Sequence, residues 1–190
     1  MPIELLQESE EVYPEIERMT REAFWDVYKP GCDEHLMVHQ LHQSPAYVSE
    51  LSLIAKDSDQ IVGHVLYTRA KVVNEQGKSF ELLCVGPLSV RPSYQRQGIG
   101  ARLMRTSIEK ARSLGYRGIA IFGSPAYYGR FGFVNAEKYS IQTSWGANFD
   151  DFMALELSAG SLDEVSGRYE YDAAFEIDKT ELEAFDRQFL

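Results

Sequence analysis

Cysteine is scarce in this chain, with only Cys32 and Cys84 among 190 residues, far apart and without a Cys-x-x-Cys pair. Two isolated thiols fit a reducing compartment better than a disulfide framework. Long apolar runs are missing too, since no stretch approaches the roughly 20 residues that a membrane span needs. The first residues, MPIELLQESEE, lack the basic segment followed by an apolar one that marks a secretion signal. We therefore expect a cytoplasmic protein with no membrane contact.

Basic residues are outnumbered, 19 against 29 acidic ones, which gives a net charge of −10. The acidic excess lies at the ends: residues 1–50 and 151–190 each carry 3 basic and 11 acidic residues, whereas residues 51–150 carry 13 and 7. Nucleic-acid binding needs a basic face to neutralise phosphates, so we expect no nucleic-acid partner. Within 86–107 there are four arginines and no acidic residue, namely Arg91, Arg96, Arg102 and Arg105. This stretch fits either a small anionic ligand or a solvated helix face.

Hydrophobic periodicity predicts an α/β fold around a mixed sheet. Helices are expected over residues 11–28, 33–43, 98–114 and 179–189, with a short one that begins at Ser124-Pro125 and ends near Gly132. Strands are expected over residues 3–8, 51–56, 61–73, 80–90, 118–122 and 152–157. Because a crossover helix separates the strands that end at Val90 and begin at Gly118, these two should be parallel. Residues 158–177 give no assignable pattern.

The length suits one hydrophobic core. We expect one domain over residues 1–150 and a C-terminal extension, residues 151–190, that packs on it.

The turn VRPSYQRQGIGA (90–101) is the segment most suggestive of chemistry. A strand ends, and two glycines, Gly98 and Gly100, alternate as a helix opens. Glycine lets the backbone approach a ligand closely, and the first N–H groups of a helix suit a phosphate. The spacing matches neither a dinucleotide fingerprint nor a nucleoside-triphosphate loop. By itself, a tight strand-to-helix turn explains it equally well.

Two segments together resemble the GNAT acyltransferase superfamily. Gln95-x-x-Gly98-x-Gly100, after GPLSV (86–90), is similar to the acyl-coenzyme A pyrophosphate motif of that family, and GSPAYYGRFGF (123–133) is similar to its closing Tyr-x-x-x-Gly-Phe signature. The resemblance covers roughly residues 3–145. It is strongest to a bacterial subgroup of predicted N-acetyltransferases with a C-terminal extension. It implies a mostly antiparallel central sheet with a splayed parallel pair, flanked by helices.

The resemblance also implies site residues. The pantetheine arm of acetyl-coenzyme A would pair with the backbone of the strand end, and Pro87 supports a bulge or splay there. Tyr128 matches the family tyrosine that protonates the departing thiolate. The family often has an asparagine at the end of the strand before the last helix. Here Gly123-Ser124-Pro125 stands in that region, so the resemblance does not imply contacts from these residues to the pantetheine arm. The cofactor-binding residues implied are Leu88, Ser89, Val90, Gln95, Arg96, Gln97, Gly98, Ile99, Gly100 and Ala101.

The general base is less clear in the sequence. A carboxylate acting through water could take the proton of the acceptor ammonium. Glu81, on the strand leading to Leu88, and Glu50, just before residues 51–56, are both candidates. Solvent or a backbone carbonyl is the alternative.

Other side chains have plainer interpretations. His35, His39 and His42 share one helical face and could line the substrate or ligate a metal, but ordinary helix surface is favoured and no metal is predicted. His64 is expected in the core or in a cleft. Cys84 is expected to be a buried small hydrophobe, and Tyr127 a packing residue.

The sequence thus predicts an acetyl-coenzyme A-dependent N-acetyltransferase in which a primary amine of a small molecule or peptide attacks directly in a ternary complex. The alternative is a non-catalytic acyl-coenzyme A-binding sensor or interaction module, and a third is a domain that binds another phosphate ligand. A homodimer is compatible with the sequence.

Overall fold

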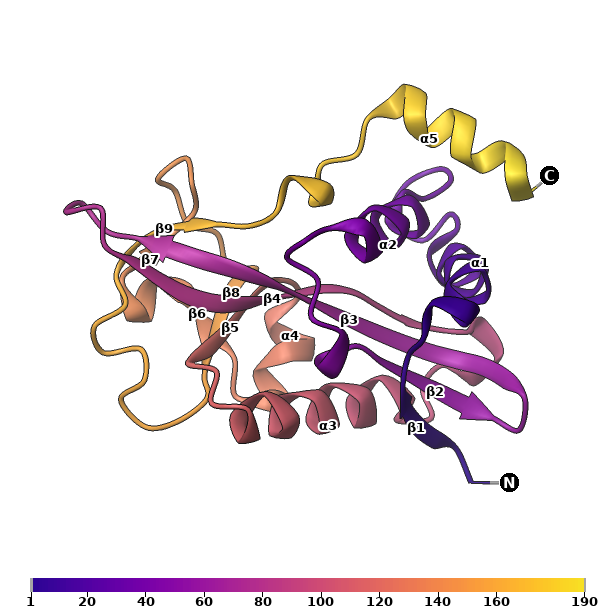
Figure 1. Cartoon of the computed structure of the whole chain (residues 1–190), viewed down its shortest axis with the longest axis horizontal. Helices are drawn as coiled ribbons and strands as arrows, with labels where there is room; N and C mark the ends of the chain where they lie inside the picture. Colours follow the sequence, from indigo (N-terminus) through magenta and orange to yellow (C-terminus); the bar gives the residue numbers. More distant parts are fainter. Residues whose placement is uncertain (1, 190) are drawn as a thin grey trace. The chain divides into compact units, whose positions relative to one another are not determined.

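The computed structural model describes residues 2–189, which form two compact units (Figure 1). The first unit contains the described residues up to Tyr67, then Gly86–Ser107, and the residues from Ala173 on. The second contains Thr68–Val85 and Ile108–Asp172. Three long elements contribute residues to both units: β3 (Gln60–Val73), β4 (Ser79–Val90) and α3 (Ile99–Ser113). Among the described residues, no helix is long and apolar enough to cross a membrane.

The strands of the first unit follow the order β1-β2-β3-β4. β1 (Glu4–Gln7) pairs antiparallel with β2 (Leu53–Asp57), and β2 pairs antiparallel with β3. The register between β2 and β3 shifts at Ala55/Lys56, where a bulge places an extra residue in β3. The bulge lets Ile61 face the same side as Leu66, which lies five residues later.

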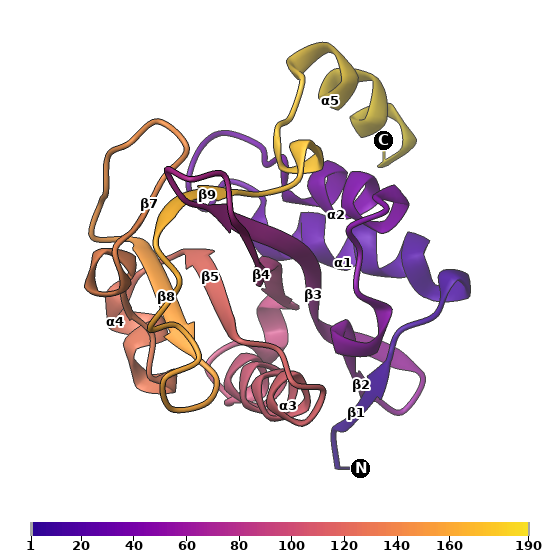
Figure 2. The ribbon, with the colours of Figure 1, turned by 60° about the vertical axis from the view of Figure 1, so that its left-hand side comes forward.

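Helices cover both faces of these strands (Figure 2). α1 (Tyr13–Phe24) and α2 (Glu34–Gln43) enclose a core with one face of β2 and β3. That core consists of Ile16, Met19, Val38, Leu41, Ile54, Ile61 and Leu66. On the other face, Gly63 lets the start of α3 approach β3, because a Cβ there would lie 3.0 Å from Ile99 Cγ2 and 3.1 Å from Leu103 Cδ1.

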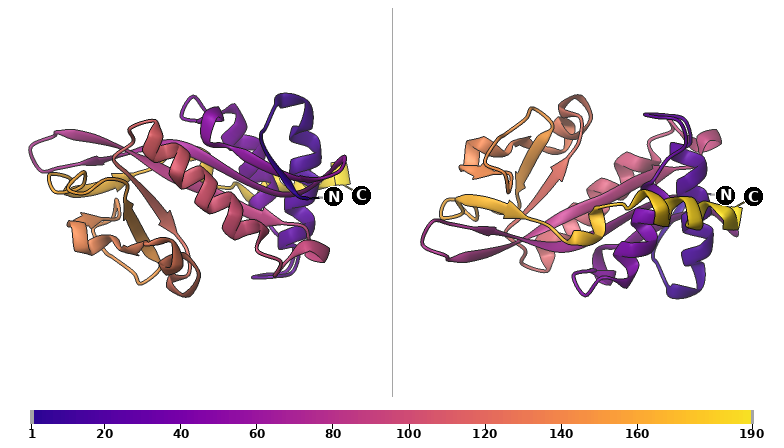
Figure 3. Two further views of the ribbon diagram at one scale, coloured as in Figure 1. Left: turned by 90° about the horizontal axis from the view of Figure 1, so that it is seen from below. Right: turned by 90° about the horizontal axis from the view of Figure 1, so that it is seen from above.

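The last helix, α5 (Lys179–Asp186), packs on α1 and α2 (Figure 3). The Asp186 carboxylate accepts hydrogen bonds from Arg21 Nε of α1 and His35 Nε2 of α2, both at 3.0 Å. Phe185 is buried and its ring centroid lies 4.7 Å from that of His39. One carboxylate therefore ties the end of the chain to two N-terminal helices.

The strands of the second unit follow the order β7-β9-β3-β4-β5-β8-β6. Four of them are short: β6 (Val134–Asn135), β7 (Ile141–Gln142), β8 (Phe152–Glu156) and β9 (Gly167–Glu170). β5 (Gly118–Phe122) runs parallel to β4 and antiparallel to β8. After β5 comes α4 (Pro125–Tyr128), then a 3₁₀ turn at Gly129–Phe131 that ends at Gly132, whose φ is +93°.

The predicted fold class is confirmed, because the sheet is mixed, mostly antiparallel and contains the expected parallel pair. The predicted first helix was too long. It ends at Phe24, because Asp26 has a left-handed φ of 55° and its side chain accepts a hydrogen bond from Gly31 N. β9 was missed in the unassigned stretch. The division into residues 1–150 and 151–190 stays a prediction.

Candidate functional site

The turn before α3 has the backbone shape of an anion cradle. Arg96 and Gly98 both have positive φ, +59° and +84°, and a Cβ on Gly98 would meet no atom within 4 Å. The first helical hydrogen bond runs from Arg102 N to Gly98 O, so the N–H groups of the residues between them precede the intrahelical ladder. Turned N–H groups at the positive end of a helix bind phosphate oxygens well. The exposed turn could therefore hold a pyrophosphate.

Two glutamines of this turn brace it from within. Gln95 Nε2 donates to Val90 O at 3.0 Å, and Gln97 Nε2 donates to Ser93 O at 3.1 Å. These bonds hold the segment between β4 and α3 in its tight path. The two side chains predicted to bind the cofactor thus have a defined structural task in the protein itself.

The four arginines do not all face this turn as free cations. Arg91 pairs with Glu22 of α1 and donates from Nε to Ile61 O at 3.2 Å. Arg102 donates from Nη2 to Ile3 O at 3.1 Å. Arg96 is exposed within the turn itself. Two of the four arginines therefore bind other parts of the first unit, namely Ile3, β3 and α1.

The end of β4 presents its two faces differently. Ser89 is buried and its Oγ lies 3.1 Å from Thr20 Oγ1 of α1. Leu88 and Val90 are half-buried and, by strand alternation, point to the opposite face. Ser89 therefore anchors the strand to α1 with its side chain, which leaves only its backbone for a ligand.

In the second unit, the parallel register joins Leu83 with Ile119 and Cys84 with Ala120. β5 then continues to Phe122, where its partner is Phe152 of β8. The next residue, Gly123, lies against the ring of Tyr128, because a Cβ on Gly123 would lie 2.3 Å from Tyr128 Cε2. The chain therefore places the Tyr128 ring directly after the last residue of the parallel strand.

Comparison with known proteins agrees with this geometry. The family model for the acetyltransferase (GNAT) domain matches residues 4–136. The chain belongs to the GNAT acetyltransferase family. It is 29% identical, over 143 residues, to the Escherichia coli K12 protein named uncharacterized N-acetyltransferase YhbS, an alignment that covers 75% of this chain and 83% of the relative.

Two solved structures are similar over nearly the whole chain. The crystal structure of Escherichia coli YhbS in complex with CoA has a TM-score of 0.80 and 26% identity, and covers 91% of each chain. A GNAT family acetyltransferase from Brucella melitensis in complex with acetyl-CoA has a TM-score of 0.75 and 27% identity, and covers 92% of this chain and 99% of its own. Both confirm the GNAT fold that the two motifs indicated.

Tyr128 of this GNAT domain lies in an aromatic setting. Its ring centroid is 5.0 Å from that of Tyr127 and 5.9 Å from that of Phe133, both edge-on. Tyr128 and Tyr127 are half-buried, whereas Phe133 is buried. Packing therefore fixes the ring of Tyr128 while part of it stays accessible, as a proton donor requires.

The two candidate bases both lie at the surface. The side chain of Glu81, on β4, is 59% exposed and its Oε2 lies 4.0 Å from Arg69 Nε. Glu50 is exposed in a 3₁₀ turn before β2 and accepts from Ser49 Oγ at 3.4 Å. Both carboxylates are accessible to solvent, and the assignment of Glu81 as the base stays a prediction.

The histidines correct one sequence interpretation. His35 and His42 are not helix surface: the side chain of His35 is fully buried and that of His42 is 2% exposed. Only His39, which bonds Glu17, has the partly exposed side chain that the prediction favoured. The helix face points inward because α5 and the chain after β1 cover it, which the local pattern could not reveal.

His42 and His64 share the buried carboxylate of Glu8. His42 Nε2 lies 3.0 Å from one carboxylate oxygen and His64 Nε2 lies 2.6 Å from the other. Burial alone would raise the pKa of Glu8, but the charge of His64 and the hydrogen bonds from both rings outweigh it and hold that pKa below its usual range. An ionised carboxylate only accepts, so each Nε2 carries the proton.

The same three residues are a candidate metal-ligand set, since their donor atoms lie within 4.8 Å of one another. Metal-bound imidazoles normally donate their other N–H to a nearby acceptor. Here Nδ1 of His42 and Nδ1 of His64 have no hydrogen-bond partner among the described residues. The arrangement therefore fits a hydrogen-bonded carboxylate better than a metal centre.

Cys32, His35 and Asp186 form a hydrogen-bonded series, with Cys32 Sγ 3.4 Å from His35 Nδ1. The order resembles that of a nucleophile, a base and an acid. However, burial, together with the negative charge of Glu34, raises the pKa of Cys32 to about 12, and only 4% of the residue is exposed. The thiol is therefore unreactive and the series is structural. Cys84 is likewise buried, as predicted, and burial raises its pKa to about 12.

Proposed function

We propose that this GNAT domain transfers the acetyl group of acetyl-coenzyme A to a primary amine of a small molecule or peptide, by direct attack within a ternary complex. The observation that carries the proposal is the turn at Arg96–Gly98, whose positive φ angles and open glycine fit a pyrophosphate at the start of α3. Coenzyme A complexes of the two similar GNAT proteins support the same ligand for this chain.

Each residue has a definite task in this proposal. The N–H groups at the start of α3 bind the pyrophosphate, and the backbone of Leu88 and Val90 pairs with the pantetheine arm. The amine nitrogen forms a bond with the acetyl carbon while the carbon–sulfur bond breaks. Tyr128, a phenol, a group whose pKa is ordinarily near 10, gives its proton to the thiolate and regains one from the nitrogen as the amide forms. The first proton, which the ammonium loses before the attack, passes to Glu81 or to solvent.

Charge suggests which acceptors are favoured. The acidic ends of the sequence, each with 3 basic and 11 acidic residues, would attract cations and disfavour anionic acceptors. Screening by salt weakens such attraction. Rates with cationic amines should therefore fall between low and moderate ionic strength, and acidic acceptors should be poor.

The test is an amine panel with acetyl-coenzyme A, in which free thiol and acetylated product are both measured. Formation of both in equal amounts is expected. Tight acetyl-coenzyme A binding without product on any amine would instead favour the non-catalytic sensor, and failure to bind acetyl-coenzyme A at all would favour another phosphate ligand.

A further inference from the structure

The end of β4 is irregular between Gly86 and Ser89. A Cβ on Gly86 would lie 2.9 Å from Leu66 Cγ, so Gly86 faces the core that α1 and α2 cover. Ser89 faces the same side, because its hydroxyl bonds Thr20 of α1. Residues three apart in a regular strand point to opposite faces. β4 therefore has a bulge between them, next to Pro87, which has no N–H with which to continue a regular ladder.

The bulge buries a polar side chain and leaves apolar ones partly exposed. Ser89 is 1% exposed, whereas its neighbours Leu88 and Val90 are only half-buried. In a regular strand, Leu88 and Val90 would lie on the same face as Gly86 and Ser89 on the other, because a shift of one residue moves every side chain to the opposite face. Hydrophobic burial alone therefore favours the regular path over the bulged path that the structure has.

A hydrogen bond between two buried hydroxyls opposes this preference. Thr20 is fully buried on α1, and its Oγ1 lies 3.1 Å from Ser89 Oγ. A hydroxyl that is buried without a partner is costly, so the pair stabilises the arrangement in which both are buried. The bond exists only when Ser89 faces α1. It therefore stabilises the bulged path and not the regular one.

The bulged path also sets the direction of the backbone groups at the strand end. Arg91 N donates to Val62 O of β3 at 2.9 Å, so this N–H points to β3. Because backbone groups alternate in direction along a strand, the N–H of Val90 points away from β3. The pairing of β4 with β5 joins Leu83 and Cys84, and within the described residues it does not extend to Val90. The N–H of Val90 is therefore available to a ligand that lies along the strand end.

We propose that Thr20 is a positioning residue for acetyl-coenzyme A. Its hydroxyl holds Ser89 toward α1, keeps β4 in the bulged path and thereby directs the N–H of Val90 to the pantetheine arm. In the regular path, the shift of one residue would turn that N–H toward β3. Thr20 acts through Ser89 and touches neither the cofactor nor the acceptor. This inference rests on the proposed function, which places the pantetheine arm along Leu88 and Val90.

Calorimetry with two ligands tests the proposal. Acetyl-coenzyme A contains the pantetheine arm, whereas 3′-phospho-ADP lacks the arm and keeps the pyrophosphate. Thr20→Val removes the hydroxyl and preserves the shape of the side chain. It should weaken the binding of acetyl-coenzyme A by about fivefold, as expected for the net contribution of one hydrogen bond, and leave the affinity for 3′-phospho-ADP unchanged. Thr20→Ser keeps a hydroxyl and should bind both ligands like the parent.

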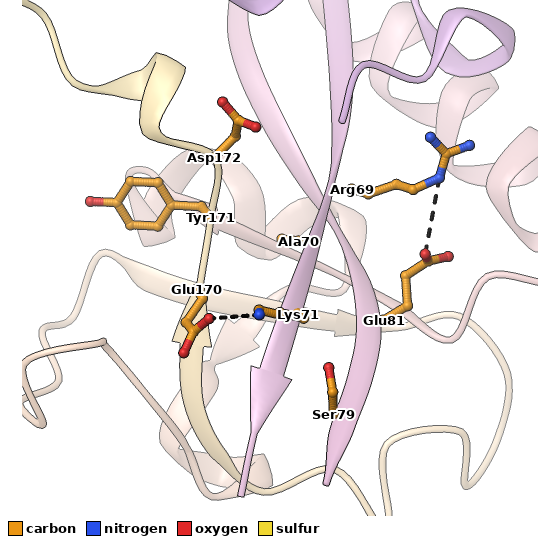
Figure 4. A pocket seen from close by; sticks show the side chains of 8 residues that line it. All are labelled: Arg69, Ala70, Lys71, Ser79, Glu81, Glu170, Tyr171 and Asp172. Atoms are coloured by element: carbon orange, nitrogen blue, oxygen red, sulfur yellow. Dashed lines mark ion pairs between the residues drawn. The ribbon is translucent and has the colours of Figure 1, made fainter. Parts of the chain in front are cut away.

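A second variant and two controls complete the design. Ser89→Ala should have the effect of Thr20→Val, and the double variant should bind no more weakly than either, because all three lack the same bond. Thr68→Val is the control for the threonine, since Thr68 is fully buried in β3 and its Oγ1 has no hydrogen-bond partner among the described residues. Ser79→Ala is the control for the serine, since Ser79 is exposed at the start of β4 and lines the pocket shown in Figure 4. Both controls should bind both ligands like the parent.

Three results would overturn the proposal. They are an unchanged affinity of folded Thr20→Val for acetyl-coenzyme A, an equal loss of affinity for both ligands, and a Thr20→Ser protein as weak as Thr20→Val. If circular dichroism shows Thr20→Val unfolded, the first two results are read from Ser89→Ala instead.

These binding measurements need no turnover, which separates the proposal from the proposed function. If Thr20→Val selectively weakens acetyl-coenzyme A binding but no amine is acetylated, the role of Thr20 stands and the proposed acetyl transfer alone fails. If the parent acetylates an amine and Thr20→Val binds acetyl-coenzyme A equally well, the role of Thr20 alone fails. A parent protein that does not bind acetyl-coenzyme A refutes both.

Discussion

The ring of Tyr128 lies against Gly123, so closely that a Cβ on the glycine would fall 2.3 Å from Cε2 and 2.6 Å from Cδ2 of the tyrosine. The family often has an asparagine in this region, and the sequence placed Gly123-Ser124-Pro125 there instead. The glycine makes room for the aromatic ring at the end of β5. The position of the proposed proton donor therefore depends on the absence of a side chain two residues before α4.

Gly123→Ala tests this dependence. The added methyl group must displace the Tyr128 ring, so we expect kcat to fall at least tenfold, toward the value of Tyr128→Phe, which removes only the hydroxyl. Loss of one general acid typically costs about 10²–10⁴ in rate. Steady-state kinetics with an acceptor amine measures both, and Tyr127→Phe is the matched control. Parent-like turnover by Tyr128→Phe would remove this hydroxyl from the mechanism.

The turn before α3 can be tested against a glycine just beyond the other end of that helix. Gly98→Ala and Gly115→Ala both place a side chain at positive φ, +84° and +81°, where no other atom lies within 4 Å of the new Cβ. Both should therefore cost about 1 kcal/mol of stability. Only Gly98→Ala should weaken acetyl-coenzyme A binding, by tenfold or more, and the Gly98→Val, Gly100→Val double variant should abolish it. Calorimetry measures the affinity for acetyl-coenzyme A. Equal affinity in the two alanine variants would show that the pyrophosphate does not bind at the turn around Gly98.

Glu8 is expected to contribute strongly to stability. Glu8→Gln leaves His42 and His64 buried without their shared carboxylate, so the free energy of unfolding should fall by about 3 kcal/mol. Glu4→Gln, at an exposed position of β1, should change it by less than about 0.5 kcal/mol. Chemical denaturation at pH 7 measures the difference. If the Glu8→Gln protein were as stable as Glu4→Gln, the hydrogen bonds of Glu8 to His42 and His64 would not contribute to stability.

The pH dependence of this contribution has a definite sign. The pKa of Glu8 is lower in the folded protein than its usual value of 4.5. The stabilisation is therefore complete above about pH 4.5 and is lost progressively as the pH falls below it, because the unfolded state binds the proton first. Denaturation midpoints of the parent and Glu8→Gln should converge in acid, and a difference that grows as pH falls would contradict this.

Asp186 is expected to hold α5 in place. Asp186→Asn removes the charge that meets Arg21 and His35, so α5 should detach more often from α1 and α2. Hydrogen exchange of residues 179–189 should become several-fold faster while that of α3 stays unchanged. Glu183→Gln, exposed on the same helix, should exchange like the parent.

Local pattern predicted those features that neighbouring residues determine. The strand 118–122 and the helix 98–114 were placed within a residue of their observed bounds, because a buried strand and an amphipathic stripe are read directly from the spacing of apolar side chains. The turn at Gly98 could be identified from the sequence because the backbone shape of a turn before a helix depends on single residues. Glycine adopts the positive φ found there without strain. The family followed from two motifs and was confirmed.

Other features depend on contacts between residues far apart in the chain. Glu8 and His64 are 56 residues apart in the sequence, and Asp186 and Arg21 are 165 residues apart. No local sequence pattern therefore predicts either hydrogen-bonded pair. The helical spacing predicts His42 at the surface, because burial by a distant segment leaves no periodic pattern in the sequence. The stacking of Phe122 on Trp145 likewise joins residues more than twenty positions apart in the chain. The sequence by itself determined most of the elements, the glycine turn before α3 and the family, because these depend on local backbone preferences and short motifs. The tertiary structure alone decided which carboxylates, histidines and rings come together, because only folding brings them within contact distance.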